Sequence, residues 1–219
     1  DGYKNIIKLS SKSYLDNSEI ATPYCELDEL INNSEGIIVL TGSIRCMFGS
    51  LFNRGLFNEI EEILIKLKEK FKDDFYIEIQ RHNDLNEKEF ENYNLKISEK
   101  FELPIIASNE VYYLDKDMFE AHDALLCIGE KTYVNDSNRI KLTNQHYFKS
   151  SDEMISLFSD LPEALENNFN FPLRCSYRPL FSNPILPNIS SDKGGNADEI
   201  LKKDSIEGLK VKFNKIFNL

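Results

Sequence analysis

The chain has 219 residues, of which 41% are hydrophobic and 29% charged, so it can form a packed core and is not a disordered segment. Its 26 Lys and Arg residues against 37 Asp and Glu residues give a formal net charge of −11. This balance disfavours a protein that grips duplex DNA by itself, although it does not exclude a local basic patch.

The sequence carries no sign of a membrane segment or of a disulfide scaffold. No apolar run approaches the ~20 residues needed to span a bilayer, and no basic leader precedes an apolar core. The four cysteines are widely spaced and form no CxxC pair, which favours buried or partly buried free thiols in a reducing cytosol over a zinc cluster. The first residue is Asp1 and not Met, so we expect an internal piece of a longer cytoplasmic protein.

The first part of the chain is predicted to form two helices and a buried strand. Apolar residues over 6–15 recur at helical spacing, and residues 24–33 show a shorter helical pattern. Residues 36–41 are a compact β-branched run, which is typical of a parallel strand buried on both faces. Gly42 and Gly49 then enclose a predicted loop.

The middle of the chain has the pattern of a βαβ unit. An amphipathic helix over 57–71 leads into residues 75–79, which alternate as a half-buried strand does. Residues 90–101 have helical spacing, and residues 103–108 form a second apolar strand. Strand, helix and strand in this order imply a parallel sheet covered by helices. Ligands in such sheets collect beyond the carboxyl ends of the strands, so any chemistry is expected there.

A further helix and an exposed connection are predicted next. Residues 117–127 have helical spacing, whereas residues 130–145 are polar and rich in Asn. The helix is predicted to turn these apolar residues inward: Phe119, Ala121, Ala124, Leu125 and Ile128. His146, at the end of the polar connection, is expected to be exposed.

The last part of the chain is predicted to hold two helices, a linker and a final helix. Ser151 is a good N-cap with acidic residues behind it, and Pro162 suits the first turn of the following helix. The predicted organisation is therefore one α/β domain over 1–170, a Pro- and Gly-rich linker over 171–199, and the start of another domain over 200–219.

Six segments, taken in order, carry a resemblance to a known family. They are GYKNIIKL at 2–9, GIIVLTG at 36–42, FYIEIQRH at 75–82, LPIIASNEVYYL at 103–114, DMFEAHDALLCIG at 117–129 and YFKSSDEMISLFSDLPEAL at 147–165. Together they are similar to the polymerase-and-histidinol-phosphatase (PHP) domain of bacterial DNA polymerase III alpha subunits. Each motif is weak singly, but the ordered set is fairly specific and covers nearly the whole chain. The resemblance implies that residues 1–170 are the later, C-terminal part of a PHP-type distorted (β/α) barrel, followed by a Pro-rich strap and a helix leading to the next domain.

The resemblance also implies a function for the parent protein. The family consists of replicative DNA-directed DNA polymerases, which extend primer-template DNA with Mg²⁺ held by carboxylates outside this region. The PHP portion is then expected to be structural and to offer a docking surface to the proofreading exonuclease and other replicase subunits. The alternative is a metal-dependent PHP phosphoesterase or 3′–5′ exonuclease.

His82 and Glu110 are the candidate metal ligands, and no residue of the chain is predicted to be catalytic. The resemblance places a metal-binding imidazole at His82, but one His in a polar turn is more commonly a solvated side chain. Metal-binding members carry Asn-Asp-x-His where this chain has Asn109-Glu110-Val111-Tyr112, and a phenol is a poor substitute for an imidazole. The chain also has no His-x-His pair, so the early metal-binding motifs of the family lie upstream of these residues or do not exist. The two residues are therefore candidate ligands of a vestigial site, or of a site whose other ligands the parent chain supplies.

Four other polar residues have more than one interpretation. Arg45 and Arg81 would contact phosphate if the strand ends form a cleft, or they are ordinary surface arginines. Glu78 points either into a barrel mouth or outward to solvent. His122 is interpreted as a packing or capping residue of its helix.

Overall fold

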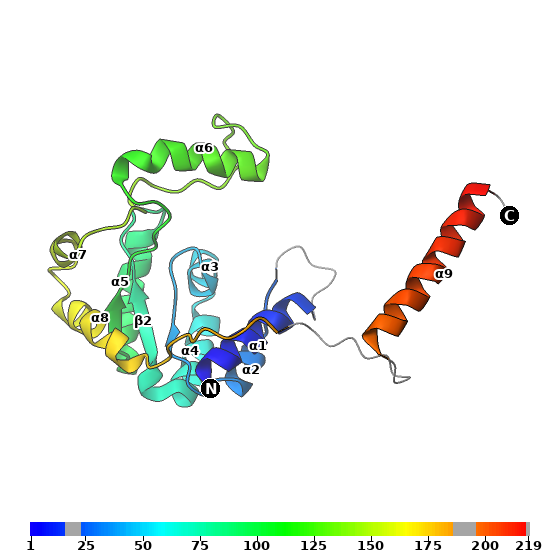
Figure 1. Cartoon of the computed structure of the whole chain (residues 1–219). Helices are drawn as coiled ribbons and strands as arrows, with labels where there is room; N and C mark the ends of the chain where they lie inside the picture. Colours follow the sequence, from blue (N-terminus) through cyan, green and yellow to red (C-terminus); the bar gives the residue numbers. More distant parts are fainter. Residues whose placement is uncertain (16–22, 186–195, 218–219) are drawn as a thin grey trace. The chain divides into compact units, whose positions relative to one another are not determined.

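A computed structural model describes residues 1–15, 23–185 and 196–217 of the chain. It divides into two compact units, residues 1–177 and 178–219. The first unit contains the sheet and is shown with its element labels in Figure 1. In the second unit, the described residues include one long helix, α9 (Ala197–Phe217), which confirms the helical pattern predicted there.

A three-stranded parallel sheet lies at the centre of the first unit. Its strands are β1 (Val39–Leu40), β2 (Phe75–Ile79) and β3 (Ile105–Ala107), in the order β1-β2-β3. The paired residues are Val39 with Phe75, Leu40 with Tyr76, Ile77 with Ile105, Glu78 with Ile106, and Ile79 with Ala107. The parallel pairing confirms the predicted βαβ unit and the α/β class. Four of the five residues of β2 are buried because this central strand is covered on both faces, so the half-buried alternation predicted for it is wrong.

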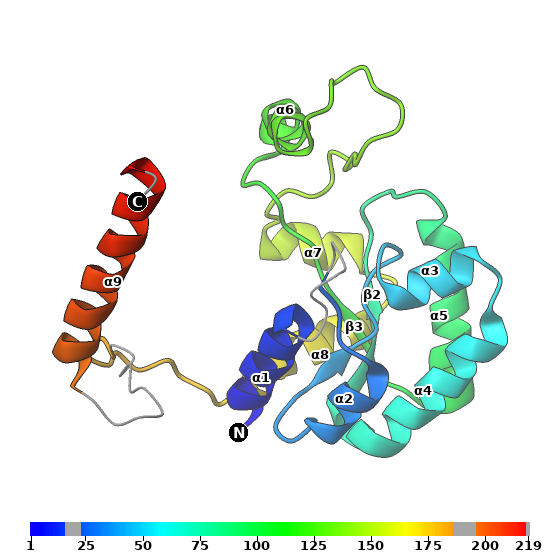
Figure 2. The same ribbon diagram turned by 90° about the vertical axis from the view of Figure 1, so that its right-hand side faces the viewer.

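Helices cover both faces of this sheet. α4 (Phe57–Phe71) and α5 (Glu87–Phe101) pack on β2, and α8 (Pro162–Arg174) packs along β3. Figure 2 shows α4 and α5 on one side of the strands and α8 on the other. The other α-helices described in this unit are α1 (Gly2–Leu15), α2 (Leu27–Asn32), α3 (Met47–Asn53), α6 (Phe119–Glu130) and α7 (Ser151–Leu157). Short 3₁₀ turns precede β2 at 72–74 and α6 at 116–118.

The hydrophobic core lies between the sheet and these helices. Its side chains that are at most 1% exposed include Ile60, Phe75, Ile77, Ile79 and Phe158. Burying an aliphatic or aromatic side chain of this size stabilises a fold by about 1.5–3 kcal/mol relative to leaving it in water. The core therefore fixes β2 in place and, with it, the polar residues that follow the strand.

The predicted loop between Gly42 and Gly49 is wrong, because α3 begins at Met47. A Cβ atom added at Gly49 would lie 2.0 Å from the carbonyl oxygen of Ile44. Glycine is therefore required here by a close backbone approach inside a helix and does not mark a loop. The helix has only seven residues, too few for its periodicity to show in the sequence.

The predicted inward orientation of α6 is also wrong. Leu125 and Ile128 are 62% and 75% exposed, and Ala121 and Ala124 are exposed as well. Figures 1 and 2 both show α6 standing away from the sheet and its covering helices. We call α6 together with residues 131–145 the arm.

The arm is held together by a polar contact and not by packing on the core. The carboxylate of Asp123 on α6 accepts hydrogen bonds from Nη1 and Nη2 of Arg139 at 2.6 and 2.7 Å. Arg139 also donates to the carbonyl oxygen of Val134 at 3.1 Å, and its side chain is only 3% exposed. The bond between Asp123 and Arg139 thus stabilises the arm, while the apolar side chains of α6 stay exposed to solvent.

The predicted helix boundaries near α7 and α8 need small corrections. The N-cap of α7 is Ser150 and not Ser151, and Ser150 exchanges hydrogen bonds with Glu153 in a capping box. Pro162 occupies the first turn of α8, as predicted. This helix continues through Pro172, and residues 186–195 of the predicted linker lie outside the described residues. The domain boundaries at 170 and 199 stay predictions, as does the Pro-rich strap.

Two predictions from composition can be compared with the structure. All four cysteines are free thiols, as predicted, but only Cys127 is buried, and the predicted burial is wrong for Cys25, Cys46 and Cys175, which are exposed. Among the helices in the described part of the chain, none combines the length and the apolar character that crossing a membrane requires.

Candidate functional site

A group of polar residues lies at the carboxyl ends of β2 and β3. His82 follows β2, Asn109 and Glu110 follow β3, and His146 returns to the same place from the end of the arm. We call these four residues the strand-end cluster. The residues after the two strands lie together because neighbouring parallel strands end at the same edge of the sheet, which is where any chemistry was expected.

His82 is buried, and both of its ring nitrogens face protein atoms. Its side chain is 1% exposed, so the common interpretation as a solvated residue is wrong. Nε2 accepts a hydrogen bond from the backbone N–H of Glu110 at 3.2 Å and lies 3.0 Å from Oδ1 of Asn109. Nδ1 lies 3.6 Å from Oε1 of Glu87, whose carboxylate also accepts from the backbone N–H of His82 at 2.8 and 2.9 Å.

His146 was not expected in the cluster, yet it is fully buried there. Its ring stacks on that of His82 with 4.2 Å between centroids and an interplanar angle of 2°. Nδ1 donates to the carbonyl oxygen of Glu110 at 3.2 Å, since a carbonyl can only accept. The two imidazoles therefore hold the backbone of Glu110 from both sides, one as acceptor of its N–H and the other as donor to its C=O.

The carboxylate of Glu110 has one partner in the described part of the chain. Oε1 accepts a hydrogen bond from the hydroxyl of Tyr112 at 2.7 Å, whereas Oε2 is buried without a hydrogen-bond partner among the described residues. The bond to Glu110, together with burial, raises the pKa of Tyr112 to about 12. Tyr112 therefore stays protonated at neutral pH and serves as a donor to the carboxylate.

Arg45 and Asp84 form an ion pair beside His146. Arg45 donates from Nε to Oδ2 of Asp84 at 2.9 Å and from Nη2 to Oδ1 at 2.5 Å. Nε2 of His146 lies 3.5 Å from Nη2 of Arg45 and 3.7 Å from Oδ2 of Asp84. Burial would raise the pKa of Asp84, but contacts with His146 and Arg45 outweigh it and lower the pKa, so the carboxylate stays ionised.

Lys149 is a buried cation at the edge of the cluster. Its ammonium donates to Oδ1 of Asn109 at 3.1 Å and to the carbonyl oxygen of Gln145, and it lies 4.6 Å from the ring centroid of Tyr147. Burial lowers the pKa of Lys149. The residue fixes the segment that returns from the arm against the end of β3.

Arg81 also lies after β2, but protein acceptors already bind the guanidinium nitrogens, so no pair of N–H groups is free to bind a phosphate. It donates to Glu91 from Nε and Nη2 at 3.0 and 2.7 Å, and to Asp160 from Nη1 and Nη2 at 2.7 and 2.8 Å. Nη1 also donates to the carbonyl oxygen of Leu157, and the guanidinium lies 4.8 Å from the ring centroid of Phe158. These carboxylates raise the pKa of Arg81, and Arg81 in turn lowers the pKa of Asp160 to about 2. Arg81 therefore joins β2 to α5 and α7.

The hydrogen bonds of Glu78 agree with an inward orientation and not with one outward to solvent. The surroundings of His122 are also defined. Oε2 of Glu78 accepts from the backbone N–H of Gly42 at 3.1 Å, and Oε1 accepts from Gln80 at 2.9 Å and from the hydroxyl of Ser108. Glu78 thus ties the ends of the three strands together. His122 is half-buried, with its ring 5.3 Å from that of Tyr113, which agrees with a packing role.

The strand-end cluster fits a metal ion poorly. A metal at Nε2 of His82 would have to displace the N–H of Glu110. Among residues 1–15, 23–185 and 196–217, no three His, Cys, Asp or Glu groups are placed so that they could hold a metal. Three ligands with an open position are the usual minimum for a catalytic zinc site. What the arrangement does chemically is to engage Nε2 of His82 and Nδ1 of His146 in hydrogen bonds with the backbone of Glu110.

Comparison with known proteins gives a consistent result. Residues 1–82 match the family model described as PHP domain. The chain is 35% identical over 211 residues to the DNA polymerase III subunit alpha of Caulobacter vibrioides, which covers 96% of this chain and 18% of that protein. The proteins of the same name from Borreliella burgdorferi and Pseudomonas fluorescens are 35% and 31% identical over 98% and 97% of the chain. The chain spans 19% and 18% of their lengths, about a fifth in each case. The resemblance carried by the ordered motifs is confirmed.

Proposed function

This chain is a relative of the DNA polymerase III alpha subunits and corresponds to their PHP region, and we propose that it has a structural and docking role within such a subunit. In this proposal the parent is a cytoplasmic DNA-directed DNA polymerase that extends primer-template DNA with Mg²⁺. The carboxylates that hold Mg²⁺ would lie outside these residues. The three-stranded sheet is then part of a distorted (β/α) barrel.

One observation carries the structural role: the nitrogens of the two stacked imidazoles are engaged by protein groups. His82 and His146 bind the N–H and the C=O of Glu110, so the imidazole of His82, which was expected to hold a metal, holds the backbone instead. Tyr112, which replaces the imidazole of metal-binding relatives, donates to the carboxylate of Glu110. These contacts support a vestigial metal site whose residues now stabilise the edge of the sheet.

The alternative function, a metal-dependent phosphoesterase or 3′–5′ exonuclease, has one observation in its favour. Oε2 of Glu110 is buried without a hydrogen-bond partner among the described residues, and a cation would satisfy it. A single carboxylate oxygen beside an occupied imidazole is a weak donor set, because catalytic sites need two or three further ligands. We therefore favour the structural role.

Addition of Mn²⁺ is expected to leave the melting temperature of the chain unchanged. A ligand that binds only the folded state at 100 times its Kd would stabilise it by about 2.7 kcal/mol, which a thermal melt detects readily. The measurement is a melt of the chain with and without Mn²⁺, with release of nucleotides from a 3′-labelled oligonucleotide as a second readout. The control is the His82→Ala/Glu110→Gln variant, which removes both candidate ligands. A melting temperature that rises with Mn²⁺ in the native chain but not in this variant, or metal-dependent release of nucleotides, would contradict the proposal.

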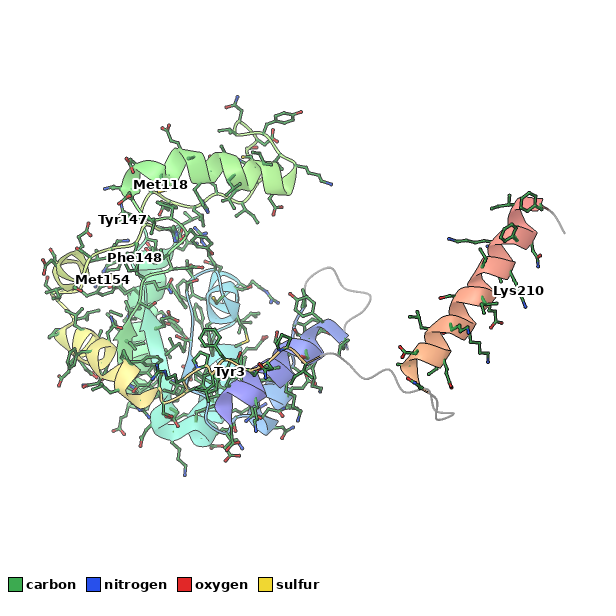
Figure 3. All side chains as sticks on the ribbon, viewed as in Figure 1. Tyr3, Met118, Tyr147, Phe148, Met154 and Lys210 are labelled. Carbon is green, nitrogen blue, oxygen red and sulfur yellow. The ribbon has the colours of Figure 1, made fainter. Side chains whose placement is uncertain are left out.

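The arm supports the docking part of the proposal. Leu125 and Ile128 lie one turn apart on the exposed face of α6, and the bond between Asp123 and Arg139 ties this helix to the returning segment of the arm. Contiguous exposed apolar side chains on an ordered element are typical of an interaction surface. In Figure 3 Met118 lies at the start of α6, near Tyr147 and Phe148 at the base of the arm, and Phe148 is 66% exposed. We infer that this surface receives the proofreading exonuclease or another replicase subunit.

The Leu125→Asp/Ile128→Asp variant of the full-length subunit is expected to bind the exonuclease subunit at least tenfold more weakly. Both side chains are solvent-exposed in the chain, so the variant should fold normally. Binding of the exonuclease subunit would bury the two new carboxylates, and the cost of removing their charges from water opposes docking. Binding is measured by titration of labelled exonuclease. The matched control is Ile65→Asp, which places a carboxylate at a 43% exposed apolar position of α4. Unchanged affinity of the α6 variant, or an equal loss in the control, would count against docking at the arm.

A further inference from the structure

An open groove of about 760 Å³ lies beside the strand-end cluster. Four segments line it: the residues after β1, the end of α3, the turn after β2, and the end of the arm at 141–143. The side chains that matter for its chemistry are Arg45, Asn53, Arg54, Asp84, Asn86 and Lys141. Its volume is in the range of pockets that hold small ligands or part of a larger one.

The charge of the groove is opposite to that of the whole chain. It contains three cationic side chains and one carboxylate, while the chain carries a formal net charge of −11. Arg45 and Asp84 neutralise each other through their bidentate pair. Arg54 and Lys141 are exposed, and neither forms an ion pair with any residue that the structure describes. Two positive charges are therefore available to a ligand.

The remaining polar groups of the groove are suited to donate hydrogen bonds. Nδ2 of Asn86 donates to Oδ1 of Asn53 at 3.0 Å, which leaves the amide NH₂ of Asn53 available as a donor. Ser50 adds a hydroxyl group to the lining, whereas the hydroxyl of Thr143 already donates to the carbonyl oxygen of His82. Leu85, between Asp84 and Asn86, is 86% exposed and offers an apolar contact at the rim. Cations, amide and hydroxyl donors around an open channel are the groups that bind phosphate oxygens in nucleic-acid complexes.

We propose that this groove binds the phosphate groups of a single DNA strand, with Arg54 and Lys141 as the charged contacts. The observations favour phosphate readout over base readout, because no aromatic side chain lines the groove on which a base could stack. An open groove admits a continuing strand, and a duplex would need a wider basic surface than two free cations provide on a chain with a formal net charge of −11. The identity of the strand as DNA rests on the proposed function, whereas the affinity for phosphate rests on the groove alone.

Fluorescence anisotropy of a labelled oligo(dT) strand at low salt tests this proposal on the full chain. Two ionic contacts predict a slope of log affinity against log salt of about −1.4, since each contact contributes about 0.7 for a single strand. The Arg54→Glu/Lys141→Glu variant is expected to bind at least tenfold more weakly and to lose most of this salt dependence. Both positions are exposed, so circular dichroism should show an unchanged fold.

The matched control is Lys66→Glu/Lys70→Glu, which makes the same change in net charge on the exposed face of α4. This end of α4 leads to the start of β2, at the edge of the sheet opposite the groove. An equal loss of affinity in the control, or no loss in the groove variant, would overturn the proposal. Competition by dTMP as strong as that by unlabelled oligo(dT), at equal phosphate concentration, would overturn strand binding as well. Primer extension by the full-length subunit tests the proposed function separately, so the two failures can be told apart.

Discussion

The Arg81→Met variant is expected to lose about 3 kcal/mol of unfolding free energy, at the lower end of the range for breaking a buried ion pair, because Glu91 keeps only the mostly exposed Lys88 as a cationic partner. The side chain of Glu91 is only 4% exposed and receives two hydrogen bonds from Arg81. The variant also removes the bonds to Asp160 and to the carbonyl oxygen of Leu157, which hold α7 against β2. Urea unfolding followed by tyrosine fluorescence measures the loss in the first unit, since all ten tyrosines lie within residues 1–177.

Two further variants separate this explanation from a general loss of charge. Lys100→Met breaks an ion pair with Glu61 that also has two contacts of 2.7 Å, but Lys100 is 54% exposed, so the expected loss is below about 1 kcal/mol. Arg81→Met/Glu91→Met removes both charges of the buried pair and should recover part of the loss. If Arg81→Met and Lys100→Met cost the same, burial of the network is not what makes Arg81 important.

Gly49→Ala is expected to destabilise the first unit by about 3 kcal/mol, at the upper end of the range for overpacking. The new Cβ atom would lie 2.0, 2.3 and 2.4 Å from the O, C and Cα atoms of Ile44, and all three belong to the backbone. No side-chain rotation can relieve such a contact, so α3 must shift away from the core. The same urea titration measures the effect.

Gly129→Ala provides the matched control, because Gly129 is also helical and nothing lies within 4 Å of its added Cβ atom. Alanine there should be neutral or stabilise the protein by up to about 1 kcal/mol, through its higher helix propensity. Equal effects of the two substitutions would show that helix propensity, and not the approach of Ile44, determines the result at Gly49.

The sequence predicted best those elements whose burial follows from a local period. The positions Ile60, Leu64, Leu67 and Phe71 of α4 follow helical spacing and are all at most 5% exposed. β2 was likewise predicted over the residues that form it. In α6, by contrast, Leu125 and Ile128 have the same kind of spacing but face solvent. A period shows that a helix has an apolar face, but it cannot show whether this chain supplies the surface that covers it.

The candidate site was only partly predictable for a related reason. His82 and Glu110 follow adjacent parallel strands, so the topology alone brings them together. His146 and Lys149 enter the site from a polar, Asn-rich segment without strand or helix periodicity. Their burial depends on contacts with His82 and Asn109, which are distant in sequence, and no local pattern encodes such contacts.

The base of the arm limits how the arm can move. Two chain segments leave and re-enter the sheet edge side by side, and Tyr113 and Tyr147 form a parallel bridge between them. The backbone N–H groups of Tyr112 and Phe148 donate across this bridge at 2.9 Å, to His146 and Tyr113 respectively. A single-stranded connection would let α6 swing about one flexible hinge. Here a rotation of one segment against the other would break these hydrogen bonds. A displacement of α6 is therefore expected to move the segment that carries His146, and with it the stacked imidazoles.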